Sequence, residues 1–499
     1  MGDLAADLVA DVVADVVVLG HGAAGCAAAI EAHDAGARVV LVDKMPAGLE
    51  GGSTRVSGGA WWEPSSAERA AVYLRSLCGE RRVPEPVIAA WAEECTRTTA
   101  WMRDTVGAEV GAVPGTLDRG IAGTVVEIPP EFPELEGSDA VTGWRAVGGA
   151  LGRSRLLTAL TEALARRDIT VLLGTRAERL VQDADGTVVG VQVTDADGAR
   201  RTLPAAGGVV LATGGFEGDA GMVRDYLRFP DTLTWGSPYN TGDGHRMAQK
   251  AGADLWHMDN MTSIEGFRVP GFESGFYARF SFRKGFLYVD GDGRRCVDEL
   301  PRTGHGQGLV HGAYEHVPVR SLHAVFDEET RLAGPVSPTA AMLPVGWNVL
   351  VEGYEWSWDN SVEVEKGWLR KADTLEELAP LIGVDPVLLV TSVARYNAAC
   401  AAGFDEQFGR EPSTLVALGD GPYYAFTSAP MVAWSNGGPR RNEHAEVLDP
   451  FGDTIPGLYA AGGVSTSYSW CKDGGMHIAD ALAFGRIAGR RASARALGA

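Results

Sequence analysis

Three glycines near the start of the chain have the spacing of a phosphate-binding turn. Gly20, Gly22 and Gly25 follow an apolar run at 16–19 and open an Ala-rich segment. In such a turn the first glycine makes the tight bend, the second lets the backbone approach a pyrophosphate, and the third brings the helix close to the strand. Asp43 ends the next apolar run, where a carboxylate can accept hydrogen bonds from both ribose hydroxyls. A glycine motif alone fits any glycine-rich turn, but strand, helix, second strand and acid together predict a dinucleotide site.

Composition and charge limit the kinds of partner. The chain has 499 residues, 45% of them hydrophobic, and a net charge of −21. This length predicts two or three structural units, and the charge disfavours nucleic acids and anionic membranes as partners. The acidic N-terminus lacks the basic and apolar regions of a signal peptide, and no apolar run reaches the roughly 18 residues of a membrane span. We therefore expect a cytoplasmic protein without a membrane span.

Six cysteines are scattered along the chain, at positions 26, 78, 95, 296, 400 and 471. None belongs to a C-x-x-C pair, and their spacing matches no zinc site. The pattern predicts free thiols in a reducing compartment and no metal centre.

A second glycine-rich segment, between Gly51 and Gly59, holds four glycines and three hydroxyl residues. It fits a surface loop, or a backbone laid against a flat ligand with Ser53, Thr54 and Ser57 donating hydrogen bonds. Together with the first motif, it resembles the FAD-dependent oxidoreductases of the fumarate reductase and 3-ketosteroid dehydrogenase superfamily, and the resemblance extends over nearly the whole chain. The resemblance implies that this segment runs along the pyrophosphate and the isoalloxazine ring. Because it contains no histidine, we expect the FAD to be bound non-covalently.

The same resemblance implies which residues contact the FAD. They include the end of an apolar run at 208–212, a segment around Thr241 that caps a helix, and the glycines before the C-terminal helix. The N-terminus of that last helix, pointed at the flavin pyrimidine, would stabilise negative charge on the reduced ring. The predicted cofactor residues are Gly20, Gly22, Ala23, Ala24, Gly25, Asp43, Lys44, Gly51, Gly52, Ser53, Thr54, Ser57, Gly58, Gly59, Ala177, Ala212, Thr213, Gly214, Asn240, Asp243, Gly462, Gly463, Gly475, Met476 and Ile478.

The chain has no second strand–glycine motif–helix unit, because the glycines at 148–152 follow no expected strand. It therefore lacks a separate pyridine-nucleotide domain, and it also lacks a redox C-x-x-C pair. An FAD with an aromatic-rich domain above it indicates hydride exchange between a substrate carbon and flavin N5. Forming or reducing a C=C bond beside a carbonyl also needs an acid or base and a donor to the carbonyl oxygen.

The carboxylate-binding residues of the fumarate reductases are mostly absent. Their two histidines correspond to Trp434 and to the segment 258–263, which contains no histidine. Their carboxylate-binding arginine corresponds to Lys472, which keeps the charge but not the bidentate fork. Their proton-donor arginine has a near match in Arg302, one residue out of register. Small dicarboxylates are therefore disfavoured as substrates.

Ketosteroid dehydrogenases use tyrosines as the base and as the carbonyl donor. The tyrosine before their last glycines would fall at Trp470 or Cys471, and Tyr468 is close enough to replace it. Tyr288 stands in the aromatic segment, where such a residue is more often part of a core. His305 lies in a flexible loop that adjoins the expected site. The candidate catalytic residues are Arg302, Tyr468, Lys472, Tyr288 and His305, and Cys471 is a further residue to test.

The hydrophobic pattern and the resemblance predict an α/β fold: a Rossmann-like FAD-binding domain with an inserted α+β substrate (capping) domain. We expect the FAD-binding domain at 1–254 and 425–499, and the aromatic-dense capping domain at 255–424. Further expected elements are helices at 67–78, 86–106 and 153–167, an irregular segment at 107–147, a meander of strands at 169–203, two helices at 371–408 broken at 383–386, and a long helix at 477–494.

These features predict an FAD-dependent oxidoreductase that introduces or reduces a C=C bond conjugated to a ketone, as in the 3-ketosteroid dehydrogenases. The small-molecule substrate is expected to be bulky, largely apolar and cyclic, because the aromatic domain lacks the dicarboxylate residues. An external electron acceptor or donor would be the second partner. Two alternatives remain: a fumarate reductase-like flavoenzyme that acts on a carboxylated substrate, with Lys472 as the carboxylate clamp, and a non-catalytic flavin-binding protein.

Overall fold

The computed structural model describes residues 13–499 apart from 115, 119–124, 128–129, 229–231, 273, 279, 281–283, 300–304, 306, 311–312, 317–321, 340–342 and 351–353. At 116–118, 125–127, 264–265, 308–310, 313, 349 and 429–430 only the backbone is described.

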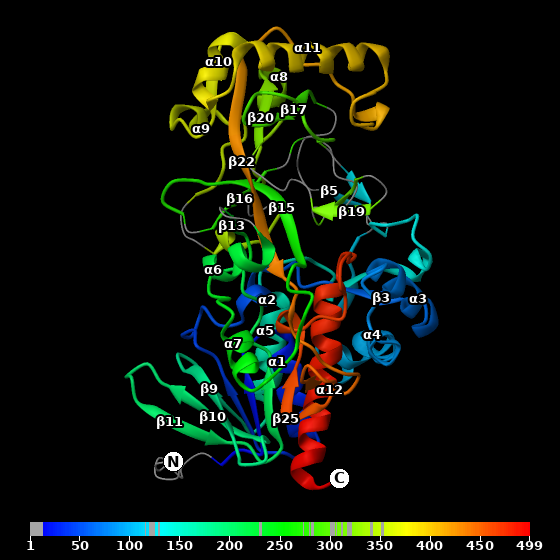
Figure 1. Cartoon of the computed structure of the whole chain (residues 1–499), viewed down its shortest axis with the longest axis vertical. Coiled ribbons are helices and arrows are strands. Elements are labelled where there is room, and N and C mark those ends of the chain that lie inside the picture. Colours follow the sequence, from blue (N-terminus) through cyan, green and yellow to red (C-terminus); the bar gives the residue numbers. More distant parts are fainter. Residues whose placement is uncertain are drawn as a thin grey trace.

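The lower part of the molecule in Figure 1 is built on one sheet. Its order is β24 (Glu446–Leu448), β25 (Thr454–Ala460), β12 (Gly208–Leu211), β1 (Val16–Leu19), β2 (Val39–Val42) and β8 (Ile169–Leu172). All strands of this sheet are parallel except β24, which is antiparallel to β25. Every residue of β1, β2 and β12 is buried, as expected for Val- and Leu-rich strands covered on both faces. The predicted Rossmann-like core is confirmed.

Two helices pack closely together on this sheet: α1 (Ala23–Asp34) and α12 (Met476–Leu497). A Cβ on Gly485 would stand 2.4 Å from the carbonyl oxygen of Ala24, and one on Gly489 would stand 2.3 Å from that of Ala28. Because a step of four residues along α12 corresponds to a step of four residues in the same direction along α1, the two helices are parallel. Both N-termini therefore point toward the carboxyl ends of the parallel strands, where the glycine motif lies.

The predicted meander is present with one strand fewer. It consists of β9 (Arg176–Gln182), β10 (Val188–Thr194) and β11 (Arg200–Pro204). The strand expected to open it, β8, pairs instead in parallel with β2, so that assignment was wrong. The physical reason is that a helix, α5 (Arg155–Ala165), precedes β8 and returns the chain to the parallel sheet.

The segment 107–147, predicted to be irregular, contains the strands β4 (Val110–Ala112), β5 (Thr116–Asp118), β6 (Val125–Glu127) and β7 (Val141–Val147). β7 pairs antiparallel with β4 and with β3 (Trp61–Pro64). The glycines at 148–152 therefore do follow a strand, contrary to the prediction. Because that strand is antiparallel, this segment is not a dinucleotide-binding unit.

Helices α3 (Ala67–Cys78) and α4 (Glu85–Asp104) confirm the predicted helical segment, and α2 (Gly52–Val56) is a short helix where a loop was expected. The smaller elements are α6 (Ala220–Met222), α7 (Asp243–Lys250), α8 (Glu328–Leu332), α9 (Ser361–Glu365), β13 (Leu233–Thr234), β14 (Leu255–Trp256), β18 (Gln307–Val310), β19 (Ala313–His316), β21 (Arg370–Ala372) and β23 (Gly438–Pro439).

The upper part of Figure 1, called the capping part below, is built on a second sheet. Its main order is β16 (Phe276–Tyr277), β15 (Met261–Phe267), β22 (Tyr423–Ser435), β20 (Leu322–Asp327) and β17 (Phe286–Val289). The predicted helix pair, α10 (Leu375–Ile382) and α11 (Pro386–Ala402), lies at its top. The long strand β22 runs from there to the lower part and across the expected boundary at 424, so the domain limits remain a prediction.

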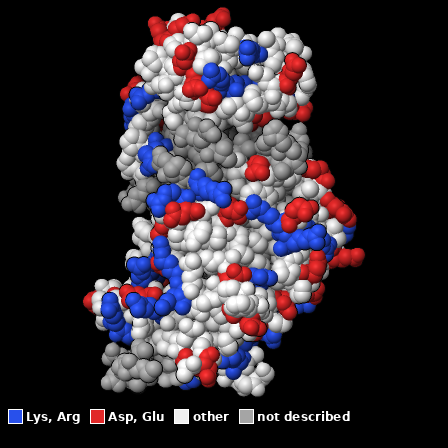
Figure 2. All heavy atoms as spheres, in the orientation of Figure 1, with Lys and Arg blue, Asp and Glu red and all other residues white. Residues whose placement is uncertain are grey.

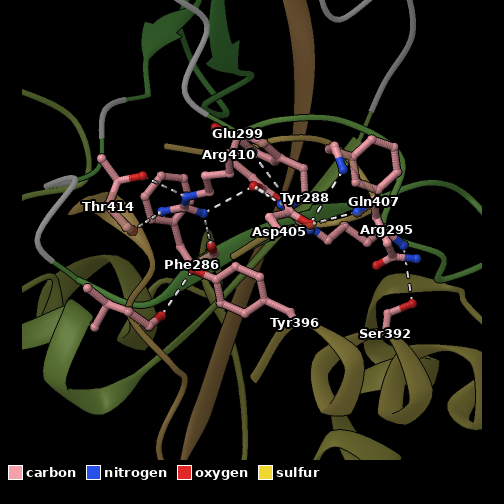
Figure 3. A network of polar contacts seen from close by, with 12 residues as sticks. Phe286, Tyr288, Arg295, Glu299, Ser392, Tyr396, Asp405, Gln407, Arg410 and Thr414 are labelled. Atoms are coloured by element: carbon pink, nitrogen blue, oxygen red, sulfur yellow. Dashed lines mark hydrogen bonds and ion pairs between the residues drawn. The ribbon is translucent and has the colours of Figure 1, made fainter. Parts of the chain in front are cut away.

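A buried ion cluster fixes the hairpin after β17 to the chain beyond α11 (Figure 3). Arg295 donates to Glu299 at 2.6 Å and to Asp405 at 2.8 Å, and Arg410 donates to Glu299 at 3.1 Å. All four side chains are at most 1% exposed. Because two cations and two anions share the cluster, each buried charge has a partner, which is the condition for tolerating it in a core.

Acidic and basic side chains intermingle over the face drawn in Figure 2. Surface ion pairs such as Arg81–Asp259, at 2.7 Å, are individually worth little. Among the described helices, none has both the length and the apolar character to cross a membrane. The described part of the chain also contains no group of three His, Cys, Asp or Glu side chains that could hold a metal ion. None of the six cysteines, all of which the structure describes, forms a disulfide bond.

Candidate active site

A continuous pocket lies at the carboxyl ends of β1, β2 and β12 and extends to the junction with the capping part. Glycines and small polar residues line one end, while aromatic rings and ionisable groups line the other. The first end is called the cradle below, and the second is called the junction end.

The glycine turn has the geometry that its sequence predicts. Gly20 adopts a φ of +109°, and a Cβ there would stand 2.3 Å from the carbonyl oxygen of Ala212, so only glycine fits. Gly22 is the N-cap of α1, and no side chain caps this helix end. The N–H of Ala23 donates to Thr54 Oγ1 at 3.0 Å, which ties the second glycine-rich segment to the helix start. The turn leaves room for a pyrophosphate beside an uncapped helix N-terminus.

Asp43 lies at the end of β2, as predicted, and is nearly buried. Its carboxylate accepts the N–H groups of His21 and Met45, each at 2.8 Å. Each carboxylate oxygen can accept a second hydrogen bond, so the group can still receive ribose hydroxyls. Next to it, Lys44 donates to Asp243 at 2.8 Å and links the cradle to the start of α7.

Most of the predicted cofactor residues line this pocket. Those that do are Gly20, Gly22, Ala23, Ala24, Asp43, Lys44, Gly51, Gly52, Ser53, Thr54, Ser57, Gly58, Gly59, Ala177, Ala212, Thr213, Gly214, Asn240, Asp243, Gly462, Gly463, Gly475 and Ile478. This clustering of segments from both ends of the chain fits an extended dinucleotide.

Gly25 and Met476 do not line the pocket. A Cβ on Gly25 would stand 1.8 Å from the carbonyl oxygen of Gly20, so Gly25 serves the packing of helix on strand that its motif position predicts. Met476 is fully buried, and its sulfur accepts the N–H of Asp473 at 3.0 Å. Both residues have a packing role in this structure, and their direct contact with the cofactor stays a prediction.

Glu217 is a buried acid of the cradle that the sequence reasoning missed. Its carboxylate accepts hydrogen bonds from Asn240 Nδ2 at 2.7 Å, Ser435 Oγ at 2.9 Å and Ser53 Oγ at 3.3 Å. Burial raises its pKa, and these donors oppose the rise. It therefore joins the second glycine-rich segment to the end of β22. Its position two residues after Gly215, in the segment that follows β12, was the available signal.

Aromatic rings form much of the junction end. The side chains of Trp144, Trp235, Tyr277 and Trp434 line it together with Leu343 and Val345. Trp235 packs against Tyr277 and Trp434, with ring centroids 5.6 Å and 6.0 Å apart. Tyr277, which belongs to the aromatic-dense segment 255–424, lies in this wall. The wall suits a flat, apolar ligand.

Lys472, a predicted site residue, places a cation at the junction end, and only 3% of it is exposed. Its Nζ lies 5.9 Å from the centroid of the Trp434 ring. Burial lowers the pKa of Lys472 from 10.5 to about 8, although the carboxylates of Glu131 and Asp473 act in the opposite direction. The amine is therefore mostly charged at neutral pH.

His305 also lines the junction end, where it pairs with Glu131. The distance between His305 Nδ1 and Glu131 Oε2 is 2.6 Å. The backbone N–H of Glu131 donates to Asp473 Oδ2 at 3.0 Å, and the hydroxyl of Tyr73 donates to the same oxygen at 2.7 Å. Burial, followed by the nearby Glu131, raises the pKa of Asp473 to about 7. Glu131 was missed because it stands in the segment predicted to be irregular.

Tyr468 does not reach the pocket wall and lies behind another residue, His477. Its hydroxyl is 2.6 Å from His477 Nδ1, and His477 lines the pocket. Burial raises the pKa of Tyr468 well above its ordinary value, so its hydroxyl stays protonated. Burial, then Lys472 and His305, lowers the pKa of His477, so its ring is neutral. Tyr468 therefore holds His477, and its own role in catalysis stays a prediction.

The other catalytic candidates lie elsewhere. Tyr288 is 5% exposed and packs in the core of the capping part, 6.1 Å from Phe286 between ring centroids, so its prediction as a catalytic residue is corrected. Arg302 falls outside the described residues. Cys471 is buried beside the site without lining it, and burial raises the pKa of its thiol.

The sequence is similar to a protein family and to characterised proteins. Residues 15–482 match the family model described as FAD binding domain. The fumarate reductase (cytochrome) of Shewanella frigidimarina is 26% identical, over 96% of this chain and 76% of its own length. The 3-oxosteroid 1-dehydrogenase of Mycobacterium tuberculosis is 28% identical, over 95% of this chain and 97% of its own.

Two solved structures share the fold. The first is a 3-ketosteroid Δ1-dehydrogenase from Sterolibacterium denitrificans, in complex with 1,4-androstadiene-3,17-dione. It has a TM-score of 0.78 at 22% identity and covers 97% of this chain and 99% of its own. The open conformation of a flavocytochrome c3 fumarate reductase has a TM-score of 0.66 at 26% identity, over 98% and 79% of the two chains. At 22% identity, the similarity to the first structure shows a shared fold and nothing more.

Proposed function

Because the chain belongs to the FAD binding domain family and is an FAD-dependent oxidoreductase acting on CH–CH groups, we propose that it forms or reduces a C=C bond conjugated to a ketone. We further propose that the substrate is bulky, largely apolar and cyclic, as for the 3-ketosteroid dehydrogenases. Its relatives are dehydrogenases and reductases, which disfavours the alternative of a non-catalytic flavin-binding protein.

The FAD is proposed to lie non-covalently along the cradle. The pyrophosphate would meet the turn at Gly20 and Gly22, the ribose would meet Asp43, and the ring would meet Gly51–Gly59 and the N-terminus of α12. When bound, FAD supplies the acceptor or donor of a hydride. The protein's own residues must then orient the substrate, hold its carbonyl oxygen and move one proton.

One observation carries the proposal: a buried cation stands in an aromatic wall at the end of the cradle. Lys472, with a pKa of about 8, is mostly protonated at neutral pH and can stabilise negative charge on a carbonyl oxygen. The rings of Trp144, Trp235 and Trp434 offer flat apolar surface and exclude water, which strengthens this interaction. His477 adds a neutral imidazole to the same wall.

The test is anaerobic and uses the FAD-loaded protein. A panel of saturated cyclic ketones, 3-keto steroids included, is mixed with the oxidised enzyme, and the flavin absorbance is recorded. Bleaching by one of them identifies a dehydrogenase. Reoxidation of the dithionite-reduced enzyme by an enone identifies a reductase. If neither occurs, while a fumarate-like acid reoxidises the enzyme, the ketone assignment is refuted.

A carboxylated substrate is the second candidate, and the position of Lys472 favours it. The residue stands where the fumarate reductases carry a carboxylate-binding arginine, and a buried ammonium can pair with a carboxylate. Under this candidate, Lys472→Met raises the KM for acids more than the KM for neutral ketones. An equal effect on both kinds of substrate contradicts it.

A further inference from the structure

Glu131 and His305 form an ion pair in the pocket that neither the predicted cofactor contacts nor the packing of the core requires. The two side chains are 15% and 17% exposed, and both line the junction end of the pocket. They are enclosed, yet a ligand in the pocket can reach them. The contact between Oε2 and Nδ1 is 2.6 Å, a short, charge-assisted geometry.

The two partners come from different parts of the molecule. Glu131 is anchored to the loop before α12, because its N–H donates to Asp473 Oδ2 at 3.0 Å. His305 is anchored to the capping part, because its carbonyl oxygen accepts the N–H of Ser263, in β15, at 3.2 Å. The pair therefore forms only when both parts are in contact.

A carboxylate at Nδ1 has a defined chemical effect on an imidazole. It accepts the Nδ1 proton, so the lone pair of the neutral ring lies on Nε2, and it stabilises the imidazolium that forms when Nε2 takes a proton. Among the residues that the structure describes, Lys472, Asp473, His477 and Tyr73 are ionisable groups near the pair. The pKa of His477 lies well below its ordinary value, which makes its neutral ring a weak base, and the raised pKa of Tyr73 keeps its hydroxyl protonated, so neither competes with His305 as a base near neutral pH.

We propose that His305 is the general base of this site and that Glu131 is its positioning residue; this deepens the proposed function and rests on it. In the dehydrogenation direction, Nε2 takes the proton from the carbon next to the ketone. The C–H electron pair stays on the substrate as an enolate, whose oxygen faces Lys472. The enolate pair would become the new C=C bond when the next carbon gives up its hydrogen as a hydride, for which a bound FAD would be the acceptor. Reduction runs the same steps in reverse, with the imidazolium as the acid.

The test measures the half-reaction in stopped flow with the ketone that bleaches the wild-type flavin, or with the enone that reoxidises it. His305→Gln is expected to slow this step by about 100-fold or more, the usual contribution of a general base. The matched control is His316→Gln: His316 lies in β19 and packs edge-on against Trp470 without lining the pocket. We expect this control to react at the wild-type rate. Ligand affinity, measured from the flavin spectral shift, is expected to change less than about threefold in both variants.

A second readout isolates the proton step. With dithionite-reduced enzyme in D₂O, the saturated ketone cannot be oxidised, so deuterium entering next to its carbonyl reports the base alone. His305→Gln should abolish this exchange. Glu131→Gln should slow it and move its acidic limb to lower pH, because losing the carboxylate lowers the pKa of the imidazole. Glu131→Asp, which keeps the charge, should restore part of the rate and the pH profile.

The outcomes separate the two proposals. If the wild type reacts with a ketone or enone and His305→Gln reacts equally fast, the assignment of His305 as the base is overturned, while the proposed function stands. An unshifted acidic limb in Glu131→Gln overturns the role of Glu131. If the wild type reacts with no ketone or enone and catalyses no exchange, the proposed function itself fails, and the base assignment fails with it.

Discussion

Replacing Lys472 by Met is expected to make the protein more stable while it impairs the enzyme. The pKa of Lys472 falls from 10.5 to about 8 in the folded state, because burial disfavours its charge. At about 1.4 kcal/mol for each pKa unit, the difference between these two pKa values corresponds to roughly 3 kcal/mol. The folded state carries this penalty whenever the amine is protonated in both the folded and the unfolded chain. Met has a similar length and no charge, so it removes the penalty.

The pH dependence follows from the sign of the shift. Below about pH 8 both states bind the proton, and the full difference of about 3 kcal/mol separates wild type from Lys472→Met. Between about pH 8 and 10.5 the folded amine is neutral while the unfolded one is still charged, so wild-type stability rises with pH relative to the variant. Above that range both states are neutral, and the difference disappears.

The assay is urea unfolding of both proteins with FAD in equal excess, at a series of pH values. Lys371→Met is the control, because Lys371 is an exposed residue of β21, and such a change is expected to stay within about 0.5 kcal/mol at every pH. A Lys472→Met variant that is less stable than wild type at neutral pH would refute the reasoning. A gain that does not change between pH 7 and 10.5 would show that the charge is not its cause.

Two further predictions concern the capping part and the cradle. Glu299→Gln leaves Arg295 and Arg410 with one buried acid between them. We therefore expect the unfolding free energy, measured by urea titration, to fall by about 3–5 kcal/mol. A loss below about 1 kcal/mol would contradict the view that these charges are buried and depend on one another. Gly22→Val places a side chain in the pocket beside Thr54 and should weaken FAD binding at least about tenfold in a fluorescence titration. The control is Gly291→Ala, at a site with no neighbour within 4 Å, and this variant should bind FAD as the wild type does.

The cradle could be predicted because its constraints are local. The bend at Gly20, the close packing at Gly25 and the acid at Asp43 each follow from a few neighbouring residues. These positions need a particular backbone geometry, which restricts the residue type at once. The same holds for the helix pair in the capping part, where a short break between two apolar periodic stretches marks the turn.

The junction end could be predicted only in part, because its contacts join distant segments. Glu131 and His305 are 174 residues apart in the chain, and Glu217 and Ser435 are 218 apart. Neither acid belongs to a motif, and Glu131 stands in a segment whose composition indicated no regular structure. His477 was recognised only as the start of a helix, since its role depends on Tyr468 reaching it from the preceding loop. The assignment of β8 failed for the same reason, because its partner is a strand far back in the sequence.

The two ends of the pocket also differ in the ionisable groups that the fold buries there. The cradle places glycines where the backbone needs them, and its buried acid Glu217 accepts hydrogen bonds from three side chains. The junction end holds an amine with a lowered pKa beside an acid with a raised one, Lys472 and Asp473. A core selected for stability alone would replace such groups by apolar ones. Their persistence next to a carboxylate–imidazole pair, inside an aromatic wall, is best explained by a reaction in which charge appears on a substrate oxygen and a proton leaves the adjacent carbon.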